Sequence, residues 1–576
     1  MRPATFRSVR WDGRGRVTMA NLDPRDRPTD ATGRESDPAS DALACLHVDA
    51  VRRWFAQSFP LGPTPAQQLA WPSIQAKAHV LLISPTGTGK TLAAFLATLD
   101  ELLHLPTPWD PLAPKRAGLH CVYVSPMRSL AHDVEHNLRR PSRAIAALMG
   151  SETSPIQVAS RTGDTSAHHR RKQLDNPPQI LITTPETLAI LLSQPAWTPH
   201  WRSVRQIIVD ELHALAPSKR GADLMLSLER LADQAESDPQ RIGLSATCRP
   251  PEVLARYLVG PARDCQILQA PPPSTSPPLE IAVQSLIQPD ESPHRSLSYR
   301  RLLRALKANI TRHRTSIIFA NTRAFTEKVT HDLRAAWTSD SSADTDLATP
   351  PIAAHHSALD VERRRRVGHD LRRVALRAVV TSTSLELGVD IGTADLAILL
   401  GPPGSVARCL QRVGRAGHRV DVATRGLILA ATAAELITAA VTAQAARAGD
   451  IEPIQPIKAP LDVLCQQLVG MSAAREWSED DAWRCIRRSA PFAELDRADF
   501  TACLRFLAGD LASPAGAFEP QPGATPRWTA PRLWRTPGLF GIRSRRVALW
   551  YRRNCGTIHA EESAVVLVDG VAVGSL

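Results

Sequence analysis

One eight-residue stretch limits the possible folds of this 576-residue chain more than any other. It reads Ser84-Pro-Thr-Gly-Thr-Gly-Lys-Thr91, follows the apolar run Val80–Ser84 and precedes a helical pattern over Leu92–Leu103. A glycine-rich loop between a buried strand and a helix is typical of the phosphate-binding P-loop. A chance glycine-rich turn is the competing interpretation, and the flanking strand and helix argue against it.

The residues of this loop predict how a nucleoside triphosphate and its metal are held. Backbone N–H groups around the glycines close on phosphate oxygens, and the helix N-terminus favours their negative charge. We expect Lys90 to reach the β- and γ-phosphates and Thr91 to hold Mg²⁺. Position 84 is Ser where the general pattern has Gly. The predicted ATP-binding residues of the loop are Thr86, Gly87, Thr88, Gly89, Lys90 and Thr91.

Short apolar runs alternate with helical patterns from about residue 80 to residue 430, which predicts parallel sheets buried on both faces. The proline-rich stretch Gln269–Pro278 predicts a linker that divides this region into two units. The polar stretch Ser339–Pro351 predicts a surface insertion. The predicted strands include Val80–Ser84, Cys121–Ser125, Ile180–Thr184, Ile207–Asp210, Ser316–Ala320, Ala378–Ser382 and Leu396–Leu400.

Beyond about residue 450 the pattern changes to amphipathic helices followed by strands. A Pro- and Gly-rich stretch, Ser513–Gly538, separates the two groups, and Arg546–Arg552 and Ala564–Val568 are predicted strands. Three helices followed by strands fit a winged-helix module. The predicted helices are Leu461–Ala474, Glu479–Ser489 and Arg497–Ala508.

A second motif supplies acidic partners for the loop. Ile207-Ile-Val-Asp-Glu-Leu-His213 places Asp210 at the end of a strand, where open α/β sheets bind ligands. We expect Asp210 to bind Mg²⁺ through water and Glu211 to be the general base that polarises the attacking water. His213 would sense the γ-phosphate and couple to Ser245-Ala-Thr247, in which Ser245 and Thr247 are the coupling residues. A strand that ends in a solvated acidic turn is the alternative.

The stretch Gln411-Arg-Val-Gly-Arg-Ala-Gly417 lies in the second unit. Phosphoryl transfer spreads negative charge over the γ-phosphate oxygens, and an arginine delivered from outside stabilises it. Arg415 is the first choice for this arginine finger, and Arg412 is the second. An arginine-rich helix start on a charged face is the other interpretation.

Charge and composition are consistent with a nucleic-acid partner. The net charge is +12 and the pI about 9.6, and excess positive charge attracts polyanions. The sequence has no apolar run of about 18 residues and no apolar signal core at its start, so no membrane contact and a cytoplasmic location are expected. The nine cysteines form no C-x-x-C pair, which favours small buried residues in a reducing compartment.

These motifs, in this order, resemble those of the superfamily-two DExH helicases and, more narrowly, the large helicase-related (Lhr) family. The resemblance covers about residues 45–450. The stretches Asp210–Leu215 with Ser218–Gly221, and Ser382–Gly392, point to this family over related ones. The matching stretches are Pro63–Gln67, the P-loop, Ser125–Ala131, Arg161–Thr165, Thr183–Thr187, Asp210–His213, Leu244–Thr247, Ile317–Arg323, His355–Leu359, Thr383–Asp390 and Gln411–His418.

The resemblance implies the fold and further roles. The fold would be α/β, with two tandem RecA-like parallel-sheet P-loop domains followed by an α+β winged-helix domain. Gln67 would read adenine, and Asp390 would join the nucleotide site. The activity would be ATP-dependent 3′-to-5′ translocation on single-stranded DNA with a DNA repair role, with ATP and Mg²⁺ as cofactors. The implied contacts to the nucleic-acid backbone are Arg128, Thr162, Thr184, Arg323 and Thr383.

The predicted domains are a disordered tail (1–45), two RecA-like domains (46–268 and 279–450) joined by the linker 269–278, a winged-helix domain (451–540) and the start of a β domain (541–576). Asn554–Ile558 and Val565–Leu576 resemble the first strands of the β domain that follows in the family. We therefore expect a truncated product, or one completed by a downstream domain or protein. His418 stands where many relatives outside the family have Arg, so one phosphate contact is expected to differ.

Other interpretations remain open. Contacts to phosphates carry little information about the sugar, so an RNA helicase of the DExH class is the rival function. A nucleic-acid-binding fragment with impaired unwinding is the other. His355 and His356 are compatible with a metal site, but a loop beside the cleft is the expected interpretation. Arg363–Arg366 is either a DNA-binding patch or a solvated helix face. The tryptophans that either stack on bases or pack in the winged-helix core are Trp477, Trp483 and Trp550.

Overall fold

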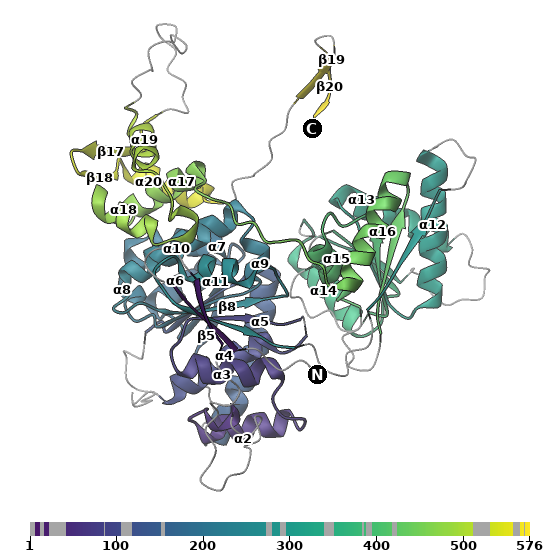
Figure 1. Ribbon diagram of the computed structural model, residues 1–576, viewed down its shortest axis with the longest axis horizontal. Coiled ribbons are helices and arrows are strands. Elements are labelled where there is room, and N and C mark those ends of the chain that lie inside the picture. The colour runs from purple at the N-terminus through teal and green to yellow at the C-terminus, as the bar shows by residue number, and fades with distance from the viewer. Residues whose placement is uncertain are drawn as a thin grey trace.

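The computed structural model forms two sheet-centred domains and a smaller helical domain (Figure 1). This confirms the predicted fold class of two RecA-like parallel-sheet domains followed by a winged-helix domain. None of the helices in the described residues is long and apolar enough to cross a membrane. The structure describes residues 6–11, 17–21, 42–85, 87–104, 118–150, 156–271, 279–287, 295–338, 351–356, 358–382, 385–386, 394–416, 423–510, 530–556, 565–568 and 571–575.

The first domain is built on a sheet with the strand order β2-β1-β9-β3-β8-β7-β4-β6-β5. The strands from β9 to β5 pair in parallel, while β1 pairs antiparallel with β2 and β9. The central strands are buried throughout, as their continuous apolar sequences predict. The bounds are β1 (Phe6–Trp11), β2 (Val17–Asn21), β3 (Val80–Ile83), β4 (Cys121–Val124), β5 (Val158–Arg161), β6 (Ile180–Thr183), β7 (Gln206–Val209), β8 (Gln240–Ser245) and β9 (Cys265–Gln269).

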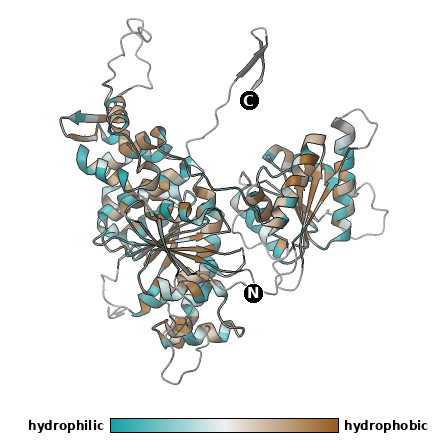
Figure 2. Ribbon diagram, viewed as in Figure 1, coloured by the Kyte–Doolittle hydropathy of each residue, from teal (hydrophilic) through white to brown (hydrophobic). Residues whose placement is uncertain are grey.

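Helices cover both faces of this sheet, and one apolar cluster lies on each side. Figure 2 shows hydrophobic residues concentrated in the central strands. Helices α2 (Asp49–Ser58), α3 (Pro65–Gln75), α4 (Lys90–His104) and α5 (Arg128–Leu148) pack on one face. The other face carries α7 (Pro185–Leu192), α9 (Leu212–Leu215), α10 (Lys219–Gln234) and α11 (Pro251–Val259). The shorter elements are α6 (Ala167–Asp175), η1 (Pro195–Trp197) and α8 (Thr198–Trp201).

The second domain has an all-parallel sheet with the order β10-β15-β14-β11-β13-β12. Its strands are β10 (Leu279–Ser285), β11 (Ser316–Phe319), β12 (Ile352–His355), β13 (Ala378–Thr381), β14 (Leu396–Leu400) and β15 (Thr424–Ala430). Helices α12 (Arg295–Arg312) and α13 (Arg323–Thr338) pack on one face. The other face carries α14 (Val361–Arg372), α15 (Val406–Val413) and α16 (Ala433–Ala448).

The winged-helix domain combines helices with a small antiparallel sheet of order β16-β18-β17. The three predicted helices are present, and α19 has the predicted bounds. The elements are α17 (Leu461–Ser472), β16 (Trp477–Ser478), α18 (Glu479–Arg487), η2 (Ala490–Phe492), α19 (Arg497–Ala508), β17 (Leu533–Thr536), β18 (Leu539–Ile542) and α20 (Arg545–Asn554). A separate hairpin joins β19 (Val565–Val568) to β20 (Val571–Ser575).

The winged-helix domain docks on α10 of the first domain through a buried polar contact. The Gln467 amide nitrogen donates to Asp223 Oδ1 (2.7 Å) and to Ser227 Oγ (2.9 Å), and its oxygen accepts from Arg230 Nη1 (2.7 Å). All four side chains are buried. Leu226 of α10 also belongs to the apolar core of the winged-helix domain. This domain is therefore anchored to the first sheet domain by polar and apolar contacts together.

The structure corrects one predicted strand and differs from the expectation at one terminus. Arg546–Arg552 is not a strand, because it lies within the helix α20. The Ser544 side chain caps this helix by accepting from the Val547 backbone, and the buried Ala548 and Tyr551 follow helical spacing. Within the expected disordered tail, β1 and β2 pair at the sheet edge. The linker residues 272–278 and most of the predicted insertion, 339–350, lie outside the described residues.

Candidate nucleotide site and nucleic-acid interface

The P-loop joins β3 to α4, and its glycines adopt a backbone conformation that other residues rarely reach. Gly87 and Gly89 each have φ 81°. The Lys90 ammonium folds back into the loop and donates to the Ser84 carbonyl (2.6 Å) and the Pro85 carbonyl (2.7 Å). Burial lowers the pKa of Lys90, which Glu211 and Asp210 oppose. The lysine therefore stands where a phosphate oxygen can replace two carbonyls as its acceptor.

Gln67 lies against this loop. It occupies the first turn of α3, where its side-chain oxygen accepts from the Thr64 backbone N–H (2.9 Å) in a capping box. The Thr64 hydroxyl donates to the Thr88 carbonyl (2.9 Å). A Cβ at Gly89 would lie 2.9 Å from Gln67 Nε2. The predicted adenine reader and the phosphate loop are thus in direct contact.

Asp210 follows β7 and is held at both carboxylate oxygens. Its Oδ1 accepts from the Glu211 backbone N–H (2.9 Å), and its Oδ2 accepts from the Tyr123 hydroxyl of the neighbouring strand β4. Glu211 has φ 49°, a left-handed conformation that is strained for a side chain of this size. Its backbone is therefore held by the surrounding turn, as is common where a side chain is positioned for chemistry.

The electrostatics of Asp210 fit a divalent cation. Burial and the neighbouring Glu211 carboxylate raise the pKa of Asp210 to about 6. Such a carboxylate is stabilised in its ionised form by a nearby cation, and oxygen donors such as a carboxylate and the Thr91 hydroxyl suit Mg²⁺. The two predicted metal-holding residues come from the first turn of α4 and from the end of β7.

His213 connects the first domain to the second. Its Nδ1 accepts from the Ala246 backbone N–H (3.1 Å) and lies 3.2 Å from Ser245 Oγ. The ring proton is therefore on Nε2, which lies 2.5 Å from the Gln411 amide of the second domain. Because Nε2 donates, we assign the amide with its oxygen towards the ring. Burial, then the charge of Lys90, lowers the pKa of His213 to about 4, so the ring is neutral.

The two finger candidates occupy different surroundings, although both are buried. Arg412 Nε donates to Glu386 Oε1 (2.5 Å), and Nη1 donates to Asn321 Oδ1 (3.3 Å), both within the second domain. Arg415 is close enough to Lys90 for its charge to lower the pKa of that lysine. Arg412 is therefore held by its own domain, whereas Arg415 acts electrostatically on the first domain's P-loop.

The predicted strand-contact residues of the first domain follow β4, β5 and β6, beside the nucleotide residues on β3, β7 and β8. Arg128 is exposed and donates to Asp164 Oδ1 (2.9 Å). Thr162 and Thr184 are buried in local turns, where Thr162 Oγ1 accepts from the Asp164 backbone. In the second domain, Arg323 is exposed at the start of α13. The predicted nucleotide-binding and strand-contact residues of the first domain thus share the carboxyl edge of one sheet.

Several predicted residues are placed elsewhere or lie outside the described residues. Thr86, Thr383 and Asp390 lie outside them, so their roles stay predictions. Thr247 is exposed and, unlike Ser245, is not brought onto His213 by the hydrogen bonds described. Sequence reasoning gave no role to Tyr123, and an aromatic residue inside an apolar strand offers no signal for one. Gln411 was given no role either, although it is the first residue of the motif that contains Arg412 and Arg415.

The structure also places the histidines, arginines and tryptophans for which the sequence left two interpretations open. His356 Nε2 lies 2.6 Å from Glu327 Oε1, and burial lowers the pKa of His355 to about 4. Arg365 of α14 contacts His132 of α5 (3.1 Å). Trp477 is buried and Trp483 packs on Phe500, whereas Trp550 is 50% exposed.

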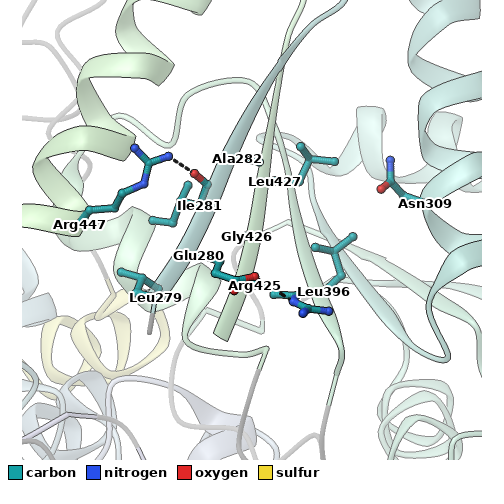
Figure 3. A pocket seen from close by; sticks show the side chains of 10 residues that line it. All are labelled: Leu279, Glu280, Ile281, Ala282, Asn309, Leu396, Arg425, Gly426, Leu427 and Arg447. Carbon is teal, nitrogen blue, oxygen red and sulfur yellow. Dashed lines mark hydrogen bonds and ion pairs between the residues drawn. The ribbon is translucent and has the colours of Figure 1, made fainter. Parts of the chain in front are cut away.

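A cavity of about 510 Å³ in the second domain is not this site (Figure 3). It lies at the amino ends of β10, β14 and β15, opposite the edge that carries Gln411 and Arg415. Arg425 pairs with Glu280 (3.0 Å), and Arg447 donates to the Ile281 carbonyl across it. None of the predicted site residues lines this cavity.

Three protein families match successive parts of the chain. The DEAD/DEAH box helicase family matches residues 64–254, and the helicase conserved C-terminal domain matches residues 298–420. The winged helix domain of the large helicase-related protein matches residues 444–576.

Curated relatives match most of the chain. The ATP-dependent helicase Lhr-Core of Methanocaldococcus jannaschii is 39% identical over 532 residues, which cover 91% of this chain and 59% of that protein. The Lhr helicase/probable uracil glycosylase of Mycolicibacterium smegmatis is 41% identical over 493 residues, covering 80% of this chain and 32% of that protein. The chain therefore spans less than two thirds of the length of either relative.

Two solved structures also match most of the chain. The structure of Mycobacterium smegmatis helicase Lhr bound to ssDNA and AMP-PNP matches with a TM-score of 0.77 and 37% identity, over 91% of this chain and 63% of that one. The DUF1998 helicase MrfA bound to DNA and AMPPNP matches with a TM-score of 0.65 at 20% identity, which supports the fold alone.

Proposed function

The chain belongs to the large helicase-related (Lhr) family of superfamily-two helicases, and from that premise we propose that it is an ATP-dependent helicase whose ATP hydrolysis is stimulated by single-stranded DNA. The observation that carries the proposal is the meeting of the two motor domains at one site. Lys90, Asp210 and Glu211 come from the first domain, while Gln411 and Arg415 come from the second.

The residues of the first domain bind and activate the nucleotide. Phosphate oxygens replace the Ser84 and Pro85 carbonyls as acceptors for Lys90. Thr91 and Asp210 would hold Mg²⁺, which neutralises phosphate charge. Glu211 takes a proton from the attacking water, and its strained backbone keeps the carboxylate directed into the site.

The residues of the second domain complete the site when the domains close. Arg415 stabilises the charge that develops on the γ-phosphate oxygens, while Arg412 holds Glu386 and Asn321 in place. The hydrogen bond between His213 and Gln411 couples the nucleotide site of the first domain to the second domain. Closure that needs both nucleotide and a bound strand makes hydrolysis depend on nucleic acid.

Single-stranded DNA is the proposed substrate, and 3′-to-5′ movement with a role in DNA repair is the proposed activity. The support is the family itself and the ssDNA in the M. smegmatis structure. Arg128, Thr162, Thr184, Arg323 and Thr383 are proposed to contact the strand backbone. Motor contacts to phosphate do not by themselves discriminate DNA from RNA.

The decisive experiment measures ATP hydrolysis with and without single-stranded DNA, and strand displacement on matched duplexes. We expect ATPase activity that rises severalfold with single-stranded DNA. We also expect displacement of DNA carrying a 3′ tail and little displacement of DNA carrying a 5′ tail. Equal displacement of RNA duplexes would favour the RNA helicase. DNA binding without hydrolysis would favour a nucleic-acid-binding fragment with impaired unwinding.

A further inference from the structure

The connection between the second sheet domain and the winged-helix domain contacts both sheet domains within five residues. It runs from the end of α16 to the start of α17 (Figure 1), and we call its first part, Asp450–Ile454, the strap. The Ile451 side chain is 7% exposed and belongs to the same apolar core of the second domain as α15. Ile454 packs against an apolar core of the first domain. Two isoleucines three residues apart are thus anchored in different domains.

On the first domain, the strap binds the backbone that follows the predicted coupling residues Ser245–Thr247. The Ile454 N–H donates to the Arg249 carbonyl (2.6 Å), and Pro453 and Arg249 are paired as in a parallel sheet. The Asp450 carboxylate lies 3.8 Å from the Arg249 guanidinium, in an exposed ion pair. The strap is therefore held beside the segment that already contacts His213.

On the second domain, Glu452 of the strap binds the start of α15. Its Oε1 accepts from the Val406 N–H (2.5 Å), and its Oε2 accepts from the Ala407 N–H (3.3 Å). The Ser405 side chain accepts from the next N–H, that of Arg408 (3.1 Å). The first N–H groups of a helix have no acceptor inside the helix, and a carboxylate beside them also suits the helix dipole. Glu452 thus supplies two of the acceptors that the first turn of α15 needs.

The same helix carries residues that meet the nucleotide site. Gln411 lies five residues after the start of α15, about 7.5 Å along its axis. Its amide contacts the His213 ring of the first domain (2.5 Å), and His213 accepts from the Ala246 N–H (3.1 Å). Arg415 follows two residues after the end of the helix. Helix α15 is therefore connected to one stretch of the first domain, Ser245–Arg249, by two routes: the strap at its start and His213 towards its end.

We propose that Glu452 is a positioning residue for the arginine finger, holding α15 so that Arg415 reaches the nucleotide site when the two sheet domains close. Glu452 acts through the helix and not on the reacting atoms. Without its carboxylate, two N–H groups of α15 lose their acceptor and the helix is no longer fixed to the strap, so the orientation of Arg415 is less well defined. The inference rests on the proposed function and deepens it, because it assigns the placement of Arg415 to a residue outside the helicase motifs.

The first measurement is the steady-state rate of ATP hydrolysis by the full chain with saturating single-stranded DNA. Glu452→Ala should lower kcat about three- to tenfold, which corresponds to the loss of one helix cap. The KM for ATP should stay within about twofold, because Lys90 and Asp210 bind the nucleotide from the first domain. Glu452→Gln retains an acceptor oxygen and should lose less. If Glu452 acts through Arg415, adding Glu452→Ala to Arg415→Ala should change kcat by less than about twofold.

The control removes an exposed carboxylate elsewhere in the same domain. Glu280 pairs with Arg425 at the opposite edge of the sheet, so Glu280→Ala takes away one surface ion pair without reaching α15. We expect this control to keep the kcat and the KM of the original protein. Equal losses of kcat in Glu280→Ala and Glu452→Ala would overturn the proposal, because surface charge would then explain them.

The second measurement tests the contact itself by hydrogen–deuterium exchange of the full chain, without nucleotide or DNA. In Glu452→Ala the amides of Val406 and Ala407 should exchange about three- to tenfold faster, because they lose their acceptor. The amides of α16 should exchange as in the original protein, and Glu280→Ala should leave α15 unchanged. This readout does not depend on hydrolysis.

Faster exchange at the start of α15, together with a kcat loss that disappears in the Arg415→Ala background, supports the proposal. Unchanged exchange overturns it, because Glu452 would then not hold the helix. Faster exchange with an unchanged kcat also overturns it, as do losses that multiply in the double variant, because the two residues would then act independently. An original protein that hydrolyses no ATP contradicts the proposed function, and the exchange rates alone then decide whether Glu452 holds α15.

Discussion

Replacing Gln467 by Met should weaken the docking of the winged-helix domain on the first sheet domain. The methionine keeps the volume and removes the amide that bonds to Asp223, Ser227 and Arg230. A buried acid and a buried arginine then each lose a hydrogen-bond partner, which costs about 1–3 kcal/mol for each group left unsatisfied. The control Asp462→Asn breaks the partly exposed pair with Lys219 in the same interface, worth under about 1 kcal/mol.

The assay is calorimetric unfolding together with limited proteolysis of the full chain. Gln467→Met should give an early transition for the winged-helix domain and faster cleavage within it, while Asp462→Asn should melt like the original protein. Nearly identical melting of Gln467→Met and Asp462→Asn would refute the reasoning, because the buried contact would then contribute no more than a surface ion pair.

The loss of stability caused by Gln467→Met should depend on pH. Burial raises the pKa of Asp223 from 3.8 to about 6, although the Gln467 hydrogen bond lowers it. Between pH 4 and 6 the folded state therefore holds a proton that the unfolded state lacks, so this group's contribution to stability falls as pH rises through that range. Without the amide the pKa of Asp223 rises further. The defect of Gln467→Met should be larger at pH 7.5 than at pH 5, and a defect independent of pH would contradict this cause.

Three further predictions concern the nucleotide site. Lys90→Ala and Glu211→Gln should each lower the rate of ATP hydrolysis by at least about a hundredfold. Only Lys90→Ala should also weaken binding of a fluorescent ATP analogue. Near-normal turnover by Glu211→Gln would show that another residue is the base. Arg415→Ala should lose DNA-stimulated turnover while DNA affinity stays within about twofold, and an equal loss of DNA binding would make Arg415 a strand contact. Tyr123→Phe frees one oxygen of Asp210 and should raise the Mg²⁺ concentration needed for analogue binding severalfold; an unchanged Mg²⁺ requirement would reduce Tyr123 to a packing role.

Much of this architecture could be predicted from local sequence patterns. Continuous apolar runs placed β3, β4 and β14 to within a residue, and helical spacing gave the bounds of α19. The same approach failed at Arg546–Arg552, because a short apolar run between arginines fits a strand as well as a helix. Burial of Tyr551 against the winged-helix core decided the outcome, and that contact is not visible in a local window.

The candidate site likewise contains residues that the sequence could predict and residues that it could not. Residues within motifs, such as Lys90 and Asp210, could be predicted as site residues because residue type and spacing together indicate their chemistry. Tyr123 could not, because its partner Asp210 is 87 residues away and the strand pairing that joins them is a property of the folded sheet. Gln467 reaches Asp223 across 244 residues, and one glutamine in an amphipathic helix gives no indication of such a contact.

The neutral ring of His213 has a consequence for the behaviour of the protein at acidic pH. A histidine at its ordinary pKa would gain a proton near pH 6.5 and carry a donor at both ring nitrogens. It would then lose the hydrogen bond from the Ala246 N–H, because Nδ1 could no longer accept. Here the pKa of about 4 keeps Nδ1 an acceptor far below that pH. The hydrogen bonds that join Ser245, His213 and Gln411 should therefore persist at mildly acidic pH, and the proposed coupling of the nucleotide site to the second domain should not depend on pH in that range.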